Sequence, residues 1–473
     1  MLFRKRELGD LTEGSILPRL VLFILPLMLS NLLQILYNAA DMMVVGLSSA
    51  ENAVGAIGTT SSLLTLIVNV FVGFSTGSNV MVARHIGAKD GERVSRTVHT
   101  SLSVSLIFGV SAGVLGLLIV RPTLAAMGAE GELLSLAVRY ASIYLLGLPF
   151  LSVFNYAMAI FRAKGDTGTP LRVLALTGLL NVGLNLFFVL VCGMTVEGVA
   201  LATMIANLLN AVILLWKLAG TEDDCRFSVS KLCLDGRAFR EILYVGLPSG
   251  VQSALFSFSN IIIQSSILRV NNMMIPEGST YQPVINGNSA SANLENFSFT
   301  AINAVHQGIV TFVGQNAGAK KGKRLYRIFG MGVAVSVMTA AFFTAVLFLF
   351  RVPLFSLYGV VEGTAGSVDR IAFETATKRL VYHSIPLVLY GFLDACNATA
   401  RALKRVISAT AVTLVGTCLL RLVWIATVFE HYVTLESIYI SYPVSWLLTG
   451  AVQFAMVMAI LRRHRQAEGD EAA

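Results

Sequence analysis

Twelve long apolar segments divide the chain, and their spacing limits what it can fold into. Their approximate limits are 20–46, 54–82, 97–120, 137–160, 171–192, 196–216, 241–269, 292–316, 328–350, 376–400, 407–428 and 434–460. A helix needs about 20 predominantly apolar residues to cross the hydrocarbon core of a bilayer. Only 13% of the residues are charged, whereas about 25% is usual for soluble domains. The sequence therefore predicts an all-α polytopic membrane protein with twelve transmembrane helices.

Basic residues gather in alternate loops. The N-terminal head, the C-terminal tail and the loops after the even-numbered spans hold 27 of the 35 Lys and Arg residues. Loops rich in Lys and Arg stay in the cytoplasm. We therefore predict a multi-pass protein of the inner (plasma) membrane with both termini cytoplasmic. The net charge of +8 then follows from the basic cytoplasmic loops beside the lipid bilayer, and no nucleic-acid partner is expected.

The two halves of the chain repeat one another. Eight positions agree between residues 77–96 and 308–327 at a constant offset of 231, and they include the Gly-Ala-Lys runs at 87–89 and 318–320. Halves of six spans have the same orientation because six is even, so the repeat is parallel. We predict two six-helix bundles related by a pseudo-two-fold axis along the membrane normal. The expected limits are 1–217 for the N-terminal lobe, 218–240 for a cytoplasmic linker and 241–473 for the C-terminal lobe.

Asp41 is the only charge in the first span, and it ends a polar stripe. Asn31, Gln34 and Asn38 precede it at spacings that place all four residues on one face of a helix. A carboxylate inside a span costs about 2.5–3.5 kcal/mol on insertion scales. We therefore predict a functional role for Asp41 beside a hydrated interior. A structural aspartate that is hydrogen-bonded between helices is the alternative.

Two pairs of polar residues in the next spans complement this carboxylate. Asn181 and Asn185 lie one turn apart in the fifth span, and Thr203 and Asn207 lie one turn apart in the sixth. Together with Asp41 they offer several oxygen ligands and one negative charge, which suits a hard monovalent cation or a proton relay. Each asparagine alone can also serve as a contact between helices.

The second half has a polar face without an acid in its first span, made by Gln252, Asn260 and Gln264. Asp394 and Arg421 are the other charges well inside predicted spans. Buried intramembrane charges tend to pair. An ion pair between these two residues is therefore the structural alternative to a functional Asp394.

Two further features of the second half are expected at the outer surface. The stretch 271–291 is rich in Asn, Ser and Gly and predicts a long outer loop. Glu295 follows it at the start of the eighth span, so we expect this side chain at the membrane interface. His306 is the one histidine of that span, and a packing role is expected for it.

Several function classes are excluded by what the sequence lacks. No Gly-x-x-x-x-Gly-Lys-Ser/Thr motif is present, so ATP is not the expected energy source. The five cysteines have no metal-ligand spacing. No catalytic constellation stands out. We therefore expect neither an enzyme nor a cofactor nor a metal site.

Several short motifs make the chain resemble a known transporter family. They are Gln34-x-x-Tyr37-Asn38-x-x-Asp41, the paired Gly-Ala-Lys loops, Arg162-Ala163-Lys164-Gly165-Asp166 and Gly314-Gln315-Asn316. With twelve spans in two parallel halves, the chain is similar to the multidrug and toxic compound extrusion (MATE) transporters. The resemblance implies a monomeric antiporter that exports small-molecule organic cations or drugs by alternating access, driven by inward H⁺ or Na⁺.

The resemblance also assigns site residues. Asp41 matches the ion-binding aspartate of the family, and Asn181 and Thr203 match its partners. Asn185 stands where many relatives have an aspartate, and Phe256 stands where one branch has an acid, although Asp394 matches a second acid of that branch. The expected ion-coupling residues are Asp41, Asn181, Asn185, Thr203 and Asp394. The expected substrate cavity is lined by Gln34, Tyr37, Asn38, Asn207, Gln252, Asn260 and Gln264.

Two other functions remain as alternatives. A flippase of lipid-linked saccharides predicts a broad basic groove, whereas Arg421 is the one deeply placed arginine of this sequence. A scaffold that transports nothing has no reason to bear the cost of burying Asp41 and Asp394.

Overall fold

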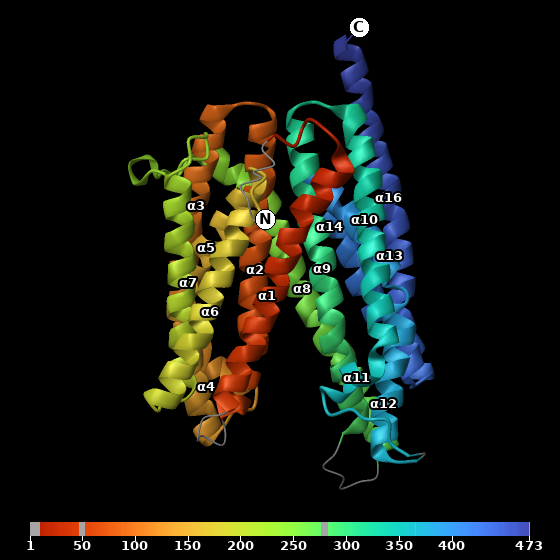
Figure 1. Cartoon of the computed structure of the whole chain (residues 1–473). Helices are drawn as coiled ribbons and strands as arrows, with labels where there is room; N and C mark the ends of the chain where they lie inside the picture. The colour runs from red at the N-terminus through yellow and green to blue at the C-terminus, as the bar shows by residue number, and fades with distance from the viewer. Residues whose placement is uncertain (1–9, 47–52, 276–281, 365, 473) are drawn as a thin grey trace. The chain divides into compact units, whose positions relative to one another are not determined.

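The computed structural model describes residues 10–46, 53–275, 282–364 and 366–472, and this part of the chain contains helices and no β-strand (Figure 1). The α-helices are α1 (Ile16–Gly46), α2 (Ala53–Gly87), α3 (Gly91–Ala126), α4 (Gly131–Leu146), α5 (Leu148–Ala163), α6 (Gly168–Leu186), α7 (Val196–Ala219), α8 (Gly236–Met274), α9 (Pro283–Gly318), α10 (Gly322–Leu349), α11 (Arg351–Ser356), α12 (Val368–Arg379), α13 (Leu387–Ala402), α14 (Val406–Thr413), α15 (Leu420–Trp424) and α16 (Leu435–Ala472). Four π-helical turns of the described residues continue or connect these helices: Phe187–Val191, Leu380–Ser384, Leu414–Leu419 and Ile425–Phe429.

The twelve predicted spans all fall on helical segments. In the described part of the chain, nine helical runs are long and apolar enough to cross a membrane, and α4 with α5 makes a tenth that is bent by 48°. The two remaining predicted spans are α9, which is rich in Asn and Ser, and α13 with the turn before it. Both are helical but less apolar, because they bury polar side chains inside the protein, as described below.

The helices form two compact units. Unit 1 comprises Met1–Ser15, Leu22–Val251 and Gly314–Ala319, and unit 2 comprises Ile16–Val21, Gln252–Val313 and Lys320–Ala473. In unit 1, α5 packs against α2, α3 and α7, and α7 also packs against α6. In unit 2, α13 packs against α10 and against α16. The lobe limits 1–217 and 241–473 stay a prediction.

The backbone supports the internal repeat. Lys89 and Lys320, which are 231 positions apart, both have φ of 56°. The left-handed region is uncommon for residues with a side chain, so its use at matching positions shows that both Gly-Ala-Lys loops turn in the same way. The turns after α5 and α13 match as well, because Gly165 and Lys404 have φ of 90° and 61°.

Glycines allow α2 to pack closely against the first half of α8 within unit 1. A Cβ atom added at Gly73 would meet the backbone of Gly250, and one added at Gly77 would meet the carbonyl oxygen of Ile242 and the backbone of Gly246. Small residues spaced by four let helix backbones approach in membranes. This contact therefore depends on the absence of side chains at these positions.

We predict that Gly77→Ala destabilises the protein while Gly58→Ala on the same helix does not. No atom lies within 4 Å of a Cβ added at Gly58, and alanine favours a helix over glycine by about 1 kcal/mol. At Gly77 the added methyl group forces the two backbones apart, and overpacking costs about 1–3 kcal/mol. Thermal unfolding of both variants in detergent measures the difference. Equal melting temperatures would show that the close contact is not needed.

The predicted long outer loop at 271–291 is wrong. α8 continues to Met274 and α9 begins at Pro283, while residues 276–281 lie outside the described part. The polar residues predict a loop, but Asn271, Asn288 and Ser291 are helical and at most 1% exposed. Their polar side chains are buried in the protein and do not face water.

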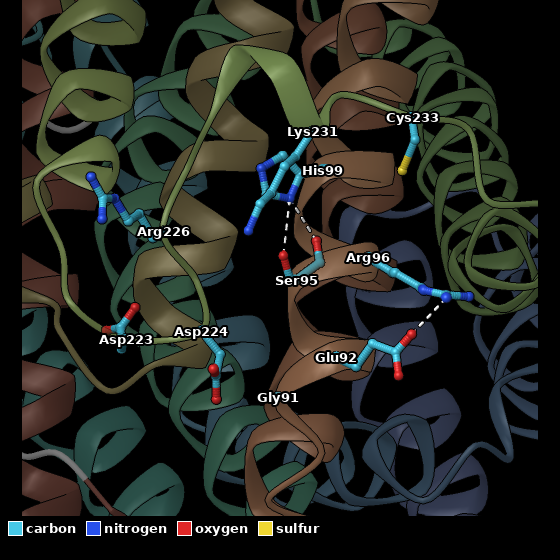
Figure 2. Close-up of a pocket in the computed structure, with 10 residues that line it drawn as sticks. All are labelled: Gly91, Glu92, Ser95, Arg96, His99, Asp223, Asp224, Arg226, Lys231 and Cys233. Carbon is cyan, nitrogen blue, oxygen red and sulfur yellow. Dashed lines mark hydrogen bonds and ion pairs between the residues drawn. The ribbon is translucent and has the colours of Figure 1, made fainter.

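The connector that follows α7 folds back onto unit 1. Lys164 Nζ lies 2.6 Å from a carboxylate oxygen of Asp223, and the backbone N–H of Ser228 donates to His99 Nε2 at 3.1 Å. Figure 2 shows His99 on α3 between Ser95 and Lys231, beside a cavity of about 580 Å³ lined by both acidic and basic side chains. None of the predicted site residues lines this cavity. The connector is thus anchored at defined points.

The two cysteines of the connector should differ in reactivity. Cys225 is 2% exposed, and burial together with the nearby Asp223 carboxylate raises its pKa to about 12, whereas Cys233 is exposed. The thiolate is the form that reacts. In variants that keep only one of these two cysteines, we expect maleimide at pH 7 to label Cys225 at least about tenfold more slowly than Cys233. Equal rates would contradict the anchored connector.

Candidate functional site in the transmembrane units

Three helices of unit 1 bring polar side chains to Asp41. The carboxylate lies on α1 and is 8% exposed. Asn185 on α6 donates from Nδ2 to Asp41 Oδ1 at 2.5 Å, and the hydroxyl of Thr203 on α7 donates to Oδ2 at 3.3 Å. Asn181, one turn before Asn185, offers its Oδ1 at 3.4 Å from the same amide nitrogen. The four predicted residues of this set therefore meet at one place.

One acceptor oxygen of this set makes no hydrogen bond to a described residue. Asn185 is fully buried, and its Oδ1 has no hydrogen-bond partner among the described residues. Buried polar atoms usually have a partner. Rotation of this amide would turn an acceptor oxygen toward Asp41, which is favourable only when a proton or a cation sits on the carboxylate. Asn185 therefore carries an acceptor oxygen that the hydrogen bonds of the described residues leave unused.

Tyr37, predicted to line the cavity, contacts α6 from α1. Its hydroxyl lies within hydrogen-bonding distance of the carbonyl oxygens of Leu174 and Ala175, at 3.4 and 3.5 Å, and its ring occupies the space left by Gly178. The other predicted cavity residues of unit 1, Gln34, Asn38 and Asn207, are half-buried or exposed. Their contact with substrate stays a prediction.

The predicted cavity residues of unit 2 lie along α8. Gln252 accepts a hydrogen bond from Arg401 Nη2 at 2.7 Å, and Gln264 accepts one from Asn288 Nδ2 at 3.4 Å. Asn260 is exposed. These residues belong to unit 2, and the Asp41 set belongs to unit 1.

Asp394 pairs with a histidine and not with an arginine. His306 Nδ1 on α9 lies 3.0 Å from Asp394 Oδ1 on α13, and both side chains are largely buried. The alternative pairing with Arg421 is therefore wrong. His306 is buried, as its expected packing role requires, and it also contacts Asp394. Sequence reasoning missed this pair because the two residues are 88 positions apart.

The expected interfacial position of Glu295 is also wrong, because the residue is 1% exposed. Arg379 donates from Nε to Glu295 Oε2 at 3.0 Å, and His383 Nδ1 lies 3.0 Å from the same oxygen. Ser384 donates to Oε1 at 2.9 Å, and Arg379 also donates to Asn288 at 2.8 Å. His383 and Ser384 lie in a π-helical turn, a feature frequent at functional sites.

A signal for this cluster was present in the sequence. Arg379 and His383 are spaced by four at the start of the tenth predicted span, so a helix presents both on one face. A buried arginine favours a carboxylate partner. Glu295, in the eighth predicted span, is a candidate for that partner.

Comparison with known proteins places this architecture in a family. The family model described as MatE matches residues 26–187 and 248–427, one stretch in each half of the chain. The chain belongs to the MatE family. This assignment makes it a multi-pass membrane protein of a family of transporters rather than enzymes.

Curated MatE relatives resemble the chain along much of its length. It is 25% identical over 466 residues to the probable multidrug resistance protein YoeA of Bacillus subtilis, covering 94% of this chain and 95% of that protein. It is 25% identical over 354 residues to the multidrug export protein MepA of Staphylococcus aureus, covering 72% of this chain and 74% of that protein.

Solved structures confirm the fold. A multidrug resistance MATE family transporter of the MOP superfamily in its outward-facing conformation has a TM-score of 0.86 at 22% identity, covering 98% of this chain and all of that chain. A MOP superfamily transporter from Pyrococcus furiosus has a TM-score of 0.87 at 21% identity and the same coverage. The predicted twelve-helix fold with two bundles is thus the MatE fold.

Proposed function

We propose that this MatE protein is a cation-coupled antiporter that exports organic cations or drugs by alternating access. The observation that carries the proposal is the buried Asp41 carboxylate, which has hydrogen-bond donors from two other helices on its two oxygens. YoeA is named a probable multidrug resistance protein and MepA a multidrug export protein. We propose the same kind of export for this chain.

The hydrogen bonds suggest how an ion would act. A proton or cation on Asp41 cancels the charge that Asn185 and Thr203 solvate, so their donated hydrogen bonds weaken and the amide of Asn185 can rotate. Since these partners lie on α6 and α7, loading changes how α1 packs on both helices. An ion that binds one packing better than the other shifts the population between inward-open and outward-open states.

The coupling ion is H⁺ or Na⁺, and no other cofactor is required. Asp41 supplies the single negative charge of the set, while Asn181, Asn185 and Thr203 supply neutral oxygens. A proton needs only the carboxylate, whereas Na⁺ also needs several of these oxygens as ligands. Replacing Asn181 with leucine should therefore weaken Na⁺-driven export strongly and H⁺-driven export little.

The remaining parts of the proposal concern place and partners. We propose that the protein acts as a monomer in the inner (plasma) membrane with both termini in the cytoplasm. Its partners are small-molecule organic cations and the bilayer. The excess of basic residues in alternate loops supports this orientation.

Drug transport into everted membrane vesicles tests the function. The cytoplasmic face of these vesicles points outward, so a fluorescent organic cation is added outside, and H⁺ and Na⁺ gradients are imposed separately. We expect transport against the cation's own gradient under at least one ion gradient, abolished by the matching ionophore. Transport that equals that of vesicles without the protein under both gradients would overturn the proposal.

A further inference from the structure

Arg421 is a buried cation that the proposed ion site does not use. It lies on α15, within the apolar run Val406–Phe429 of unit 2, and is 5% exposed. Its Nε donates to the hydroxyl of Ser445 at 2.9 Å. Its guanidinium carbon lies 4.1 Å from the ring centre of Tyr442 and 5.7 Å from that of Trp446. Within the described ranges no carboxylate lies within 4 Å of it.

The acids of the neighbouring helices are already paired. His383 contacts the same two rings, with centroid distances of 4.3 Å to Tyr442 and 4.9 Å to Trp446. The carboxylate next to His383 is that of Glu295, which Arg379 binds. Asp394 binds His306. Arg379 therefore has the Glu295 carboxylate as its partner, and the positive charge of Arg421 has no carboxylate within 4 Å among the described residues.

The free part of Arg421 has a definite chemistry. A guanidinium has five N–H donors in a planar fork, and Nε uses one of them on Ser445. The remaining donors form no hydrogen bond with a described residue. This fork can donate to both oxygens of a carboxylate at once, and it can also bind a small monovalent anion. The ammonium group of a lysine has no such planar pair of donors. The rings of Tyr442 and Trp446, inclined by 66° to one another, lie beside the Arg421 guanidinium.

We propose that Arg421, Tyr442 and Trp446 form an anion site inside unit 2 that takes a carboxylate or a small inorganic monovalent anion. The anion completes the charge balance that the protein's own acids leave open. If its source is the substrate, exported drugs that carry an acidic group on an aromatic body are preferred. Only this last assignment rests on the proposed function, because anion binding itself requires no transport.

Iodide quenching of Trp446 fluorescence tests the site directly. The chain has three tryptophans, so Trp216→Phe with Trp424→Phe leaves Trp446 as the single reporter. In detergent, with gluconate as the reference anion, we expect quenching that saturates with iodide concentration. Arg421→Gln should remove the saturable part or weaken the apparent affinity at least tenfold. Ser445→Ala, which keeps the charge, is the matched control and should retain saturation.

Competition identifies the source of the anion. Benzoate, benzylammonium and 4-(aminomethyl)benzoate share one ring and differ in charge, and chloride is the inorganic competitor. Displacement of iodide by the two carboxylates and not by benzylammonium supports a substrate carboxylate. Displacement by chloride alone supports an inorganic anion.

One result overturns the proposal whatever the variants do. Linear, non-saturating quenching in the single-tryptophan protein with Arg421 intact means that no anion binds beside Trp446. If Arg421→Gln does not fold, Arg421→Lys replaces it, because lysine keeps the charge without the fork and should weaken the saturable component. A lack of coupled efflux would leave this result unchanged, so the two proposals fail separately.

Discussion

Replacing Asp41 with asparagine is expected to remove the dependence of drug efflux on the ion gradient. The carboxylate is the only charged member of the set on α1, α6 and α7, and the substitution keeps its shape but not its charge. Coupling free energies between two sites are typically 1–3 kcal/mol, about 5–150-fold in affinity. We therefore expect gradient-driven efflux to fall by about 5–150-fold. Efflux from vesicles with an imposed gradient measures it.

Two controls separate this effect from misfolding. Asp41→Asn should keep its melting temperature, because a neutral amide can still bond to Asn185 and Thr203. Asp235→Asn removes an acid of the connector, whose carboxylate lies 3.7 Å from Arg96, and it should leave efflux unchanged. Full gradient-driven efflux in Asp41→Asn would mean that another group couples transport to the ion.

Glu295→Gln is expected to produce a large loss of stability. The substitution leaves the Arg379 guanidinium buried without its carboxylate, and breaking a buried pair by removing one partner costs about 3–5 kcal/mol. Glutamine has nearly the same size as glutamate, so a loss of stability is due to the missing charge and not to a cavity. Unfolding of the purified protein in detergent, followed by melting temperature, measures it.

An exposed ion pair of the same unit provides the control. Glu430 lies 2.6 Å from Arg269, with both side chains about half exposed. Surface ion pairs contribute about 0–1 kcal/mol, so Glu430→Gln should change stability little. If Glu295→Gln were as stable as Glu430→Gln, the buried cluster would not hold α9 to α12.

Features that depend on near neighbours in the chain could be predicted from the sequence. Helices follow from apolar runs, and the internal repeat follows from identities at a fixed offset, which the matching φ values of Lys89 and Lys320 support. The Asp41 set was predicted because each pair on α6 and α7 is one turn apart. The structure brings these residues together as hydrogen-bonded neighbours.

Pairings between distant residues could not be predicted in the same way. Glu295 and Arg379 are 84 positions apart, and nothing in either local pattern names the other. The polar stretch 283–291 predicts a loop, because residues of this kind are usually solvated. In the structure it begins α9, and Asn288 bonds to Arg379 and Tyr439. Polarity marks a need for partners and does not say whether water or protein supplies them.

Ion flux evoked by substrate tests the central claim most directly. The protein is reconstituted in proteoliposomes that contain a pH indicator or a sodium indicator, and an organic cation is added without an imposed ion gradient. We predict an ion flux opposite in direction to the substrate in the wild-type protein and none in Asp41→Asn. Substrate uptake without any ion movement, or equal ion flux in both proteins, would contradict coupling through Asp41.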